Sequence, residues 1–172
     1  MGYAGGLKEK PDYNNLGDHT EAVQVDYDPQ RISYEHLLEI FWNSHTPTSR
    51  SWSTQYKNAI FYHDETQRRA GEDTRAALAQ KTGRTIHTGV VPLRSFNLAE
   101  NYHQKYLLKQ RADLSAEMAR VYPLNRDFID STAVARLNGY IGANGSTAQL
   151  AREIDSLGLS EASRRVLESL AR

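Results

Sequence analysis

The chain has 172 residues, a length that suits one ordinary domain with a single core. Lysine plus arginine and aspartate plus glutamate number 21 each, so no net charge attracts the chain to nucleic acid or to an anionic membrane surface. The sequence contains no cysteine, which excludes disulfides, thiolate metal sites and any thiol redox cycle of its own.

The first predicted element is a strand over residues 22–27, where AVQVDY alternates apolar and polar side chains. The turn Asp28-Pro29 ends this strand. A helix is predicted to begin after Ser33, a suitable N-cap, and to end before Pro47, because apolar residues recur on one helical face. That face consists of Leu37, Leu38, Phe41 and Trp42.

A second strand is predicted over residues 55–63. A long helix follows, capped by Asp64, continuing to Thr82 and stopped by Gly83. Residues 85–92 form a third predicted strand. This alternation of strands and helices predicts an α/β or α+β fold, in which helices pack against a sheet.

After Leu108 the sequence becomes a series of short amphipathic helical segments: LSAEMARVY, DFIDSTAVARLNGYIG, STAQLAREIDSLG and LSEASRRVLESLAR. Residues 158–160 combine a helix stop with a new N-cap, which predicts a helical hairpin. We therefore divide the chain into a domain over residues 1–109 and a C-terminal helical extension over residues 110–172. The glycines of NGYIGANG, residues 138–145, fit no phosphate-binding pattern and predict a plain turn.

Several longer motifs carry a family resemblance. They are GYAGG at residues 2–6, HTEAVQVDYDP at 19–29, ISYEHLLEIFWNSHTPT at 32–48, QYKNAIFYH at 55–63 and AENYHQKYL at 99–107. Over residues 2–109 the chain resembles the peptide methionine sulfoxide reductase A family, whose members are peptide-methionine (S)-S-oxide reductases that repair oxidised methionine. The resemblance implies an α+β two-layer sheet domain with helices, related to the ferredoxin-like fold.

The resemblance also implies a nucleophile that this chain does not contain. The family attacks the sulfoxide with a cysteine thiolate in a GCFWG-type motif upstream of the segment matching GYAGG, and the aromatic pair of that motif receives the methionine methyl group. Here Met1 alone precedes GYAGG, so we expect an N-terminally truncated reductase that is inactive as written. The alternative is a non-catalytic module that binds methionine sulfoxide, or one completed in trans by another chain.

The family's substrate-binding hydroxyls have counterparts in Tyr3 and Tyr56. In the family two tyrosines hold the sulfoxide oxygen and a buried carboxylic acid protonates it. Asn15 stands where many members have the acid and cannot donate a proton, so the candidate acids are Asp18 and Glu21. From the residues alone, such tyrosines more often pack a core edge, with the hydroxyl satisfied by backbone, and Asp18 could equally be a solvated loop residue.

Two further residues are candidates for substrate binding. Trp52 can line the cleft, although an aromatic residue in a loop is also a common packing anchor. His103 matches a family segment near the end of the catalytic domain. The other histidines considered lack metal-ligand spacing, and no metal site is predicted. They are His36, His45, His63 and His87.

The resemblance implies methionine-S-sulfoxide as the substrate, free or in proteins. It implies no bound cofactor, with thioredoxin or another thiol as the reductant. Neither a membrane span nor a signal peptide is visible, so we expect a soluble, cytoplasmic protein without nucleic-acid or membrane partners.

Overall fold

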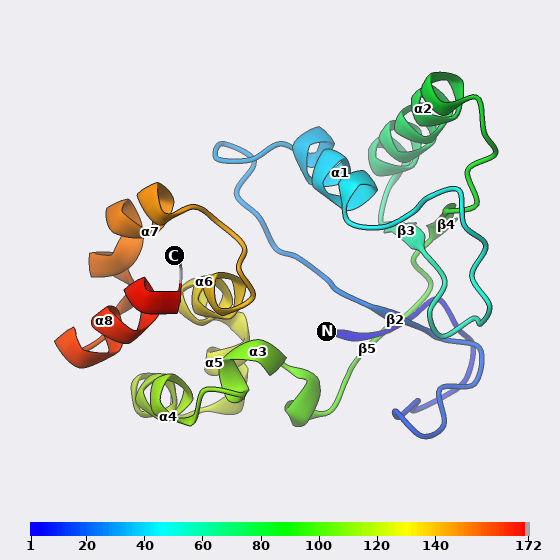
Figure 1. Cartoon of the computed structure of the whole chain (residues 1–172). Helices are drawn as coiled ribbons and strands as arrows, with labels where there is room; N and C mark the ends of the chain where they lie inside the picture. The colour runs from blue at the N-terminus through cyan, green and yellow to red at the C-terminus, as the bar shows by residue number, and fades with distance from the viewer. Residues whose placement is uncertain (171–172) are drawn as a thin grey trace. The chain divides into compact units, whose positions relative to one another are not determined.

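The structure is a computed structural model that describes residues 1–170. The chain divides into two compact units, Met1–Glu100 and Asn101–Arg172, and each is described by itself. Figure 1 follows the elements along the chain from β1 to α8. The boundary between the units lies at Glu100, so the division expected after Lys109 falls inside the second unit, at the end of a short helix.

The first unit contains a three-stranded antiparallel sheet in the order β2-β1-β5. Its strands are β1 (Gly2–Ala4), β2 (Thr20–Ala22) and β5 (Phe96–Leu98). Neither β1 nor β5 was predicted, because three residues are too few for alternation to be visible. Gly2 is required in the central strand, since a Cβ there would lie 2.4 Å from the Phe96 ring.

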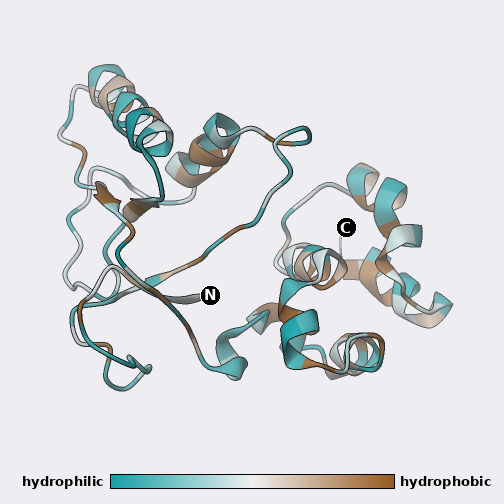
Figure 2. Ribbon diagram, turned by 180° about the vertical axis from the view of Figure 1, so that it is seen from behind, coloured by the Kyte–Doolittle hydropathy of each residue, from teal (hydrophilic) through white to brown (hydrophobic). Residues whose placement is uncertain are grey.

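A second, two-stranded sheet pairs β3 (Ala59–Tyr62) with β4 (Gly89–Pro92) in parallel. The long helix α2 (Glu65–Thr82) connects these strands, as parallel pairing requires. In Figure 2 the two strands are brown and α2 is mostly teal, so the strands provide most of the apolar surface here. Helix α1 (Tyr34–Asn43) contributes Leu38 and Trp42 to a core that they share with Ile60.

The helix boundaries predicted for this unit are confirmed. The Ser33 side chain accepts a hydrogen bond from the backbone N–H of His36 at the start of α1. Asp64 does the same for Gln67 at the start of α2, and Gly83 ends that helix with a φ of 64°. Such caps can be read from sequence because they depend on neighbouring residues alone.

The strand predicted over residues 22–27 is wrong beyond Ala22. Residues 23–27 have no assigned secondary structure, and the side chains of Val23 and Val25 are 73% and 57% exposed. Among the described residues, no backbone hydrogen bond joins this stretch to a strand. Alternation identified a segment suited to a strand, but a strand also needs a neighbour with which to pair.

The other two predicted strands are shorter than expected. The strand predicted over residues 55–63 is confirmed only for Ala59–Tyr62, because a turn precedes it in which Lys57 N–H bonds to the Thr54 carbonyl at 3.4 Å. The strand predicted over residues 85–92 begins only at Gly89.

The second unit is helical around a single core. Its elements are η1 (Asn101–His103), α3 (Tyr106–Lys109), α4 (Ala112–Val121), α5 (Asn125–Asp130), α6 (Thr132–Ile141), α7 (Thr147–Glu153), η2 (Ile154–Leu157) and α8 (Glu161–Leu170). Leu114, Met118 and Leu137 are fully buried in its core. The segment DFIDSTAVARLNGYIG forms two helices, because the Ser131 side chain caps α6. Gly158 ends η2 with a φ of 71°, as expected of a helix stop. The mixed α/β fold with C-terminal helices is thus confirmed.

Candidate functional site

The candidate site is built around Tyr56, in the turn before β3. Its neighbour Gln55 donates from Nε2 to Glu21 Oε1 at 2.7 Å and to the Tyr56 hydroxyl oxygen at 3.0 Å. The Glu21 backbone N–H also bonds to the Gln55 carbonyl at 3.0 Å. These hydrogen bonds connect the turn to β2. Two of the expected site residues, Glu21 and Tyr56, both accept hydrogen bonds from the side-chain amide of Gln55.

A cavity of about 300 Å³ adjoins this arrangement. It is lined by Met1, Glu21, Ala22, Val23, Gln55, Tyr56, Lys57 and Asn58. The lining includes an acidic residue, Glu21, and a phenol, Tyr56, which is a hydrogen-bond donor suited to a small polar group.

Trp52 packs against Tyr56, which is one of the residues that line this cavity. Its ring is 84% exposed and packs against the Tyr56 ring with centroids 5.4 Å apart and planes inclined by 48°. Tyr56 is itself 44% exposed. The two rings form an accessible aromatic surface, and Trp52 is not a core anchor.

The surroundings of Tyr56 favour its protonated form. A hydrogen bond with the Tyr13 side chain raises the pKa of Tyr56 above its usual value, and desolvation and the charge of Glu21 act in the same direction. The hydrogen bond from Gln55 opposes this effect by favouring the phenolate. At neutral pH Tyr56 is therefore a neutral hydroxyl that can donate.

Tyr3 occupies a different environment. It lies in β1 opposite Glu21, its side chain is fully buried, and its hydroxyl donates to Glu100 Oε2 at 2.5 Å. The other carboxylate oxygen of Glu100 accepts from the backbone N–H of Tyr13 at 3.0 Å. Tyr3 and Tyr56 are thus connected through Glu100 and Tyr13. Sequence reasoning missed Glu100, since nothing in AENYH shows that it contacts a residue 97 positions away.

Asp18 belongs to a turn near the N-terminus. Its exposed carboxylate accepts from the backbone N–H of Leu7 at 2.8 Å and from that of Lys8 at 3.1 Å. These bonds, first from Leu7 and then from Lys8, hold the pKa of Asp18 below its usual value. The buried His19 fastens the same turn, with Nδ1 accepting from Gly6 N–H at 3.3 Å. This environment stabilises the charged carboxylate, which is unfavourable for a proton donor.

His103 lies in η1 of the second unit, where its ring packs on Tyr102 with centroids 4.2 Å apart. The arrangement around Tyr56 belongs to the first unit, so the structure does not assign His103 to it.

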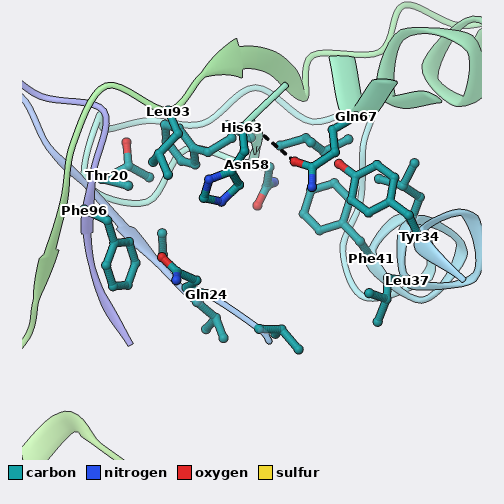
Figure 3. A pocket seen from close by; sticks show the side chains of 18 of the residues that line it. Thr20, Gln24, Tyr34, Leu37, Phe41, Asn58, His63, Gln67, Leu93 and Phe96 are labelled. Carbon is teal, nitrogen blue, oxygen red and sulfur yellow. Dashed lines mark hydrogen bonds between the residues drawn. The ribbon is translucent and has the colours of Figure 1, made fainter. Parts of the chain in front are cut away.

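A larger cavity of about 750 Å³ lies in the first unit between the unpaired stretch 23–27, α1 and β3. In Figure 3, Leu37 and Phe41 enter it from α1 and Phe96 enters from the opposite side. His63 lies between them, and its backbone N–H donates to Gln67 Oε1 at 2.9 Å. The lining is mostly apolar, as in a protein core, and the backbone on one side is unpaired.

Within residues 1–170, no cluster of three or more histidine or acidic side chains could hold a metal ion. None of the helices described is both long enough and apolar enough to cross a bilayer.

Comparisons with known proteins point to one family. A family model described as peptide methionine sulfoxide reductase matches residues 1–136. A peptide methionine sulfoxide reductase of Drosophila melanogaster is 36% identical, with 96% of this chain and 67% of the relative covered. Peptide methionine sulfoxide reductase A5 of Oryza sativa is 38% identical, with 81% and 57% covered. A peptide methionine sulfoxide reductase MsrA of Methanosarcina acetivorans is 39% identical, with 64% of each covered.

Solved structures agree with this assignment. The crystal structure of reduced Mxr1 from Saccharomyces cerevisiae matches with a TM-score of 0.59 and 28% identity, over 65% of this chain and 70% of that one. The chain spans between 57% and 67% of the length of the three curated relatives named above.

Proposed function

The chain belongs to the peptide methionine sulfoxide reductase family, and on this premise we propose that its first unit binds the sulfoxide group of oxidised methionine for reduction by a thiol. The observation that carries the proposal is the neutral Tyr56 hydroxyl, fixed by Gln55 beside a cavity of about 300 Å³. A sulfoxide oxygen is a strong hydrogen-bond acceptor, and this hydroxyl is a suitable donor.

The reaction moves oxygen from one sulfur to another. A thiolate attacks the sulfoxide sulfur and forms an S–S bond while the oxygen is protonated. The hydroxyl group then leaves that sulfur and bonds to the thiolate sulfur as the S–S bond breaks, which yields a thioether and a sulfenic acid. A second thiol then reduces the sulfenic acid and releases water, with formation of a disulfide. The Tyr56 hydroxyl assists only the first step, by donating a hydrogen bond to the oxygen as it gains charge.

The nucleophile must come from outside these 172 residues, because the chain has no cysteine and a serine hydroxyl is hardly ionised at neutral pH. We place the segment that supplies it in the larger cavity. There the unpaired stretch 23–27 offers backbone groups for a further strand, and the apolar lining offers burial. The chain on its own would then bind sulfoxide without reducing it.

We further propose that the reductant is a thioredoxin-type thiol protein, that the S form of the sulfoxide is the substrate, and that the protein works in the cytoplasm. These three statements rest on the family resemblance.

Sulfoxide binding is tested with N-acetyl-methionine-S-sulfoxide methylamide, using calorimetry on the 172-residue chain. We expect saturable binding that is stronger than binding of the R epimer or of the thioether, since only the S-sulfoxide places an acceptor at Tyr56. Equal affinity for sulfoxide and thioether would contradict the proposal.

A further inference from the structure

Gln55 makes two hydrogen bonds from one nitrogen atom. Its Nε2 lies 2.7 Å from Glu21 Oε1 and 3.0 Å from the Tyr56 hydroxyl oxygen. An ionised carboxylate only accepts hydrogen bonds, so Glu21 fixes the orientation of the amide with its nitrogen toward the carboxylate. The amide nitrogen has two hydrogens, and the second one is directed to Tyr56.

This contact decides how Tyr56 can act. Because its oxygen accepts from Gln55, its own hydrogen points elsewhere. Within the chain, the hydroxyl interacts with the Tyr13 side chain. A sulfoxide oxygen in the adjoining cavity can take the place of Tyr13 as the acceptor.

We propose that Gln55 is a positioning residue that orients the Tyr56 hydroxyl as a hydrogen-bond donor toward the substrate oxygen, and that Glu21 serves to fix the Gln55 amide. The inference deepens the proposed function and rests on it. It gives Glu21 the role of an acceptor, in place of the proton-donating role expected from sequence. The backbone bond from Glu21 N–H to the Gln55 carbonyl, at 3.0 Å, holds both residues in register for this purpose.

The decisive variant exchanges the two side chains, as Glu21→Gln with Gln55→Glu. The exchange keeps the net charge and the hydrogen bond between the two positions, but it places a carboxylate against the Tyr56 oxygen. The Tyr56 hydroxyl then donates to position 55 and is lost to the substrate. We expect about tenfold weaker binding of the sulfoxide, equivalent to one hydrogen bond.

A second readout does not depend on the substrate. The Tyr56 phenol is followed by ¹³Cζ NMR in tyrosine-labelled protein, and its signal is assigned by its absence in Tyr56→Phe. In the exchanged variant we expect Tyr56 to titrate at higher pH than in the wild type, because the carboxylate stabilises the protonated phenol. If the side chain at position 55 did not contact the Tyr56 hydroxyl, this titration would be unchanged.

Two further variants keep the test decisive. Gln55→Met removes the donor without adding charge, so it should also raise the Tyr56 pKa and weaken sulfoxide binding if the exchanged variant fails to fold. Gln80→Met, on the exposed side of α2, is the matched control and should change neither readout.

If Tyr56 titrates and the sulfoxide binds in the exchanged variant as they do in the wild type, the proposal is overturned. Failure of the wild type to bind sulfoxide would refute the proposed function, while the Tyr56 titration would still decide the role of Gln55.

Discussion

At the scale of single residues, the two tyrosines expected in the site differ in environment. Tyr56 is 44% exposed beside a cavity, whereas Tyr3 is fully buried and donates to Glu100. A buried hydroxyl that donates to a carboxylate contributes to stability, and its removal leaves the acceptor unsatisfied. Tyr3 therefore lies in a buried, mainly structural environment, whereas Tyr56 is accessible.

The Tyr3 contact can be measured as a coupling energy. Tyr3→Phe and Glu100→Gln should each destabilise the chain by about 1 to 3 kcal/mol, because the first removes the donor of a charge-assisted hydrogen bond and the second removes its charge and one of the two acceptor oxygens. In a double-mutant cycle from urea unfolding, the double variant should lose about 1 kcal/mol less than the sum of the two. Strict additivity would show that the two side chains do not interact in solution.

Asp18 gives a prediction of how stability depends on pH. Its folded pKa lies below the usual 3.8, so its charged form contributes stability that is present above that value and is lost as pH falls through the lowered pKa. Asp18→Asn should therefore be less stable than the wild type near pH 7, and the difference should shrink in strongly acidic solution. Urea unfolding at both pH values checks this. A difference that is constant with pH, or that grows in acid, would mean that the Leu7 and Lys8 bonds do not favour the carboxylate.

At the scale of elements, prediction from sequence succeeded where the determinants are local. The helices α1 and α2 begin and end at the expected residues, because Ser33, Asp64 and Gly83 act on backbone groups within a turn of themselves. Strands depend on partners distant in sequence, which is why β1 and β5 were missed and residues 23–27 were assigned wrongly. The site was only partly predictable for the same reason, since the Tyr3 and Glu100 contact joins opposite ends of the first unit.

The unpaired stretch 23–27 should tolerate substitutions that a packed strand does not. Val25 is 57% exposed, so Val25→Lys should change the free energy of unfolding of the chain by no more than about 0.5 kcal/mol. Leu38→Ala in α1 is the comparison, because that side chain is 3% exposed and its truncation should cost about 2 to 5 kcal/mol. Both values come from urea unfolding monitored by circular dichroism. A loss at Val25 as large as that at Leu38 would mean that this stretch packs against a partner in solution.

At the scale of the whole molecule, the first unit contains a large cavity with a mostly apolar lining, separate from the smaller cavity that Tyr56 lines. The cavity of about 750 Å³ lies between α1, β3 and the unpaired stretch 23–27. An apolar space of this size lowers stability relative to a filled core, since its lining side chains lack contacts on one side. The absence of cysteine and this cavity are the two observations on which we base the further segment proposed above.

The 172-residue chain should therefore fail to turn over methionine sulfoxide. With dithiothreitol as the only thiol, conversion of dabsyl-methionine-S-sulfoxide to the thioether, measured by chromatography, should not exceed that of a sample without protein. The reason is chemical, because oxygen transfer needs a thiolate held against the sulfoxide sulfur, and a dissolved thiol lacks the effective molarity of a fixed one. Binding of the same substrate, measured in parallel, distinguishes an inactive but folded chain from an unfolded one. Turnover clearly above the control would show that these residues reduce the sulfoxide by another route, and the need for an additional segment would then be disproved.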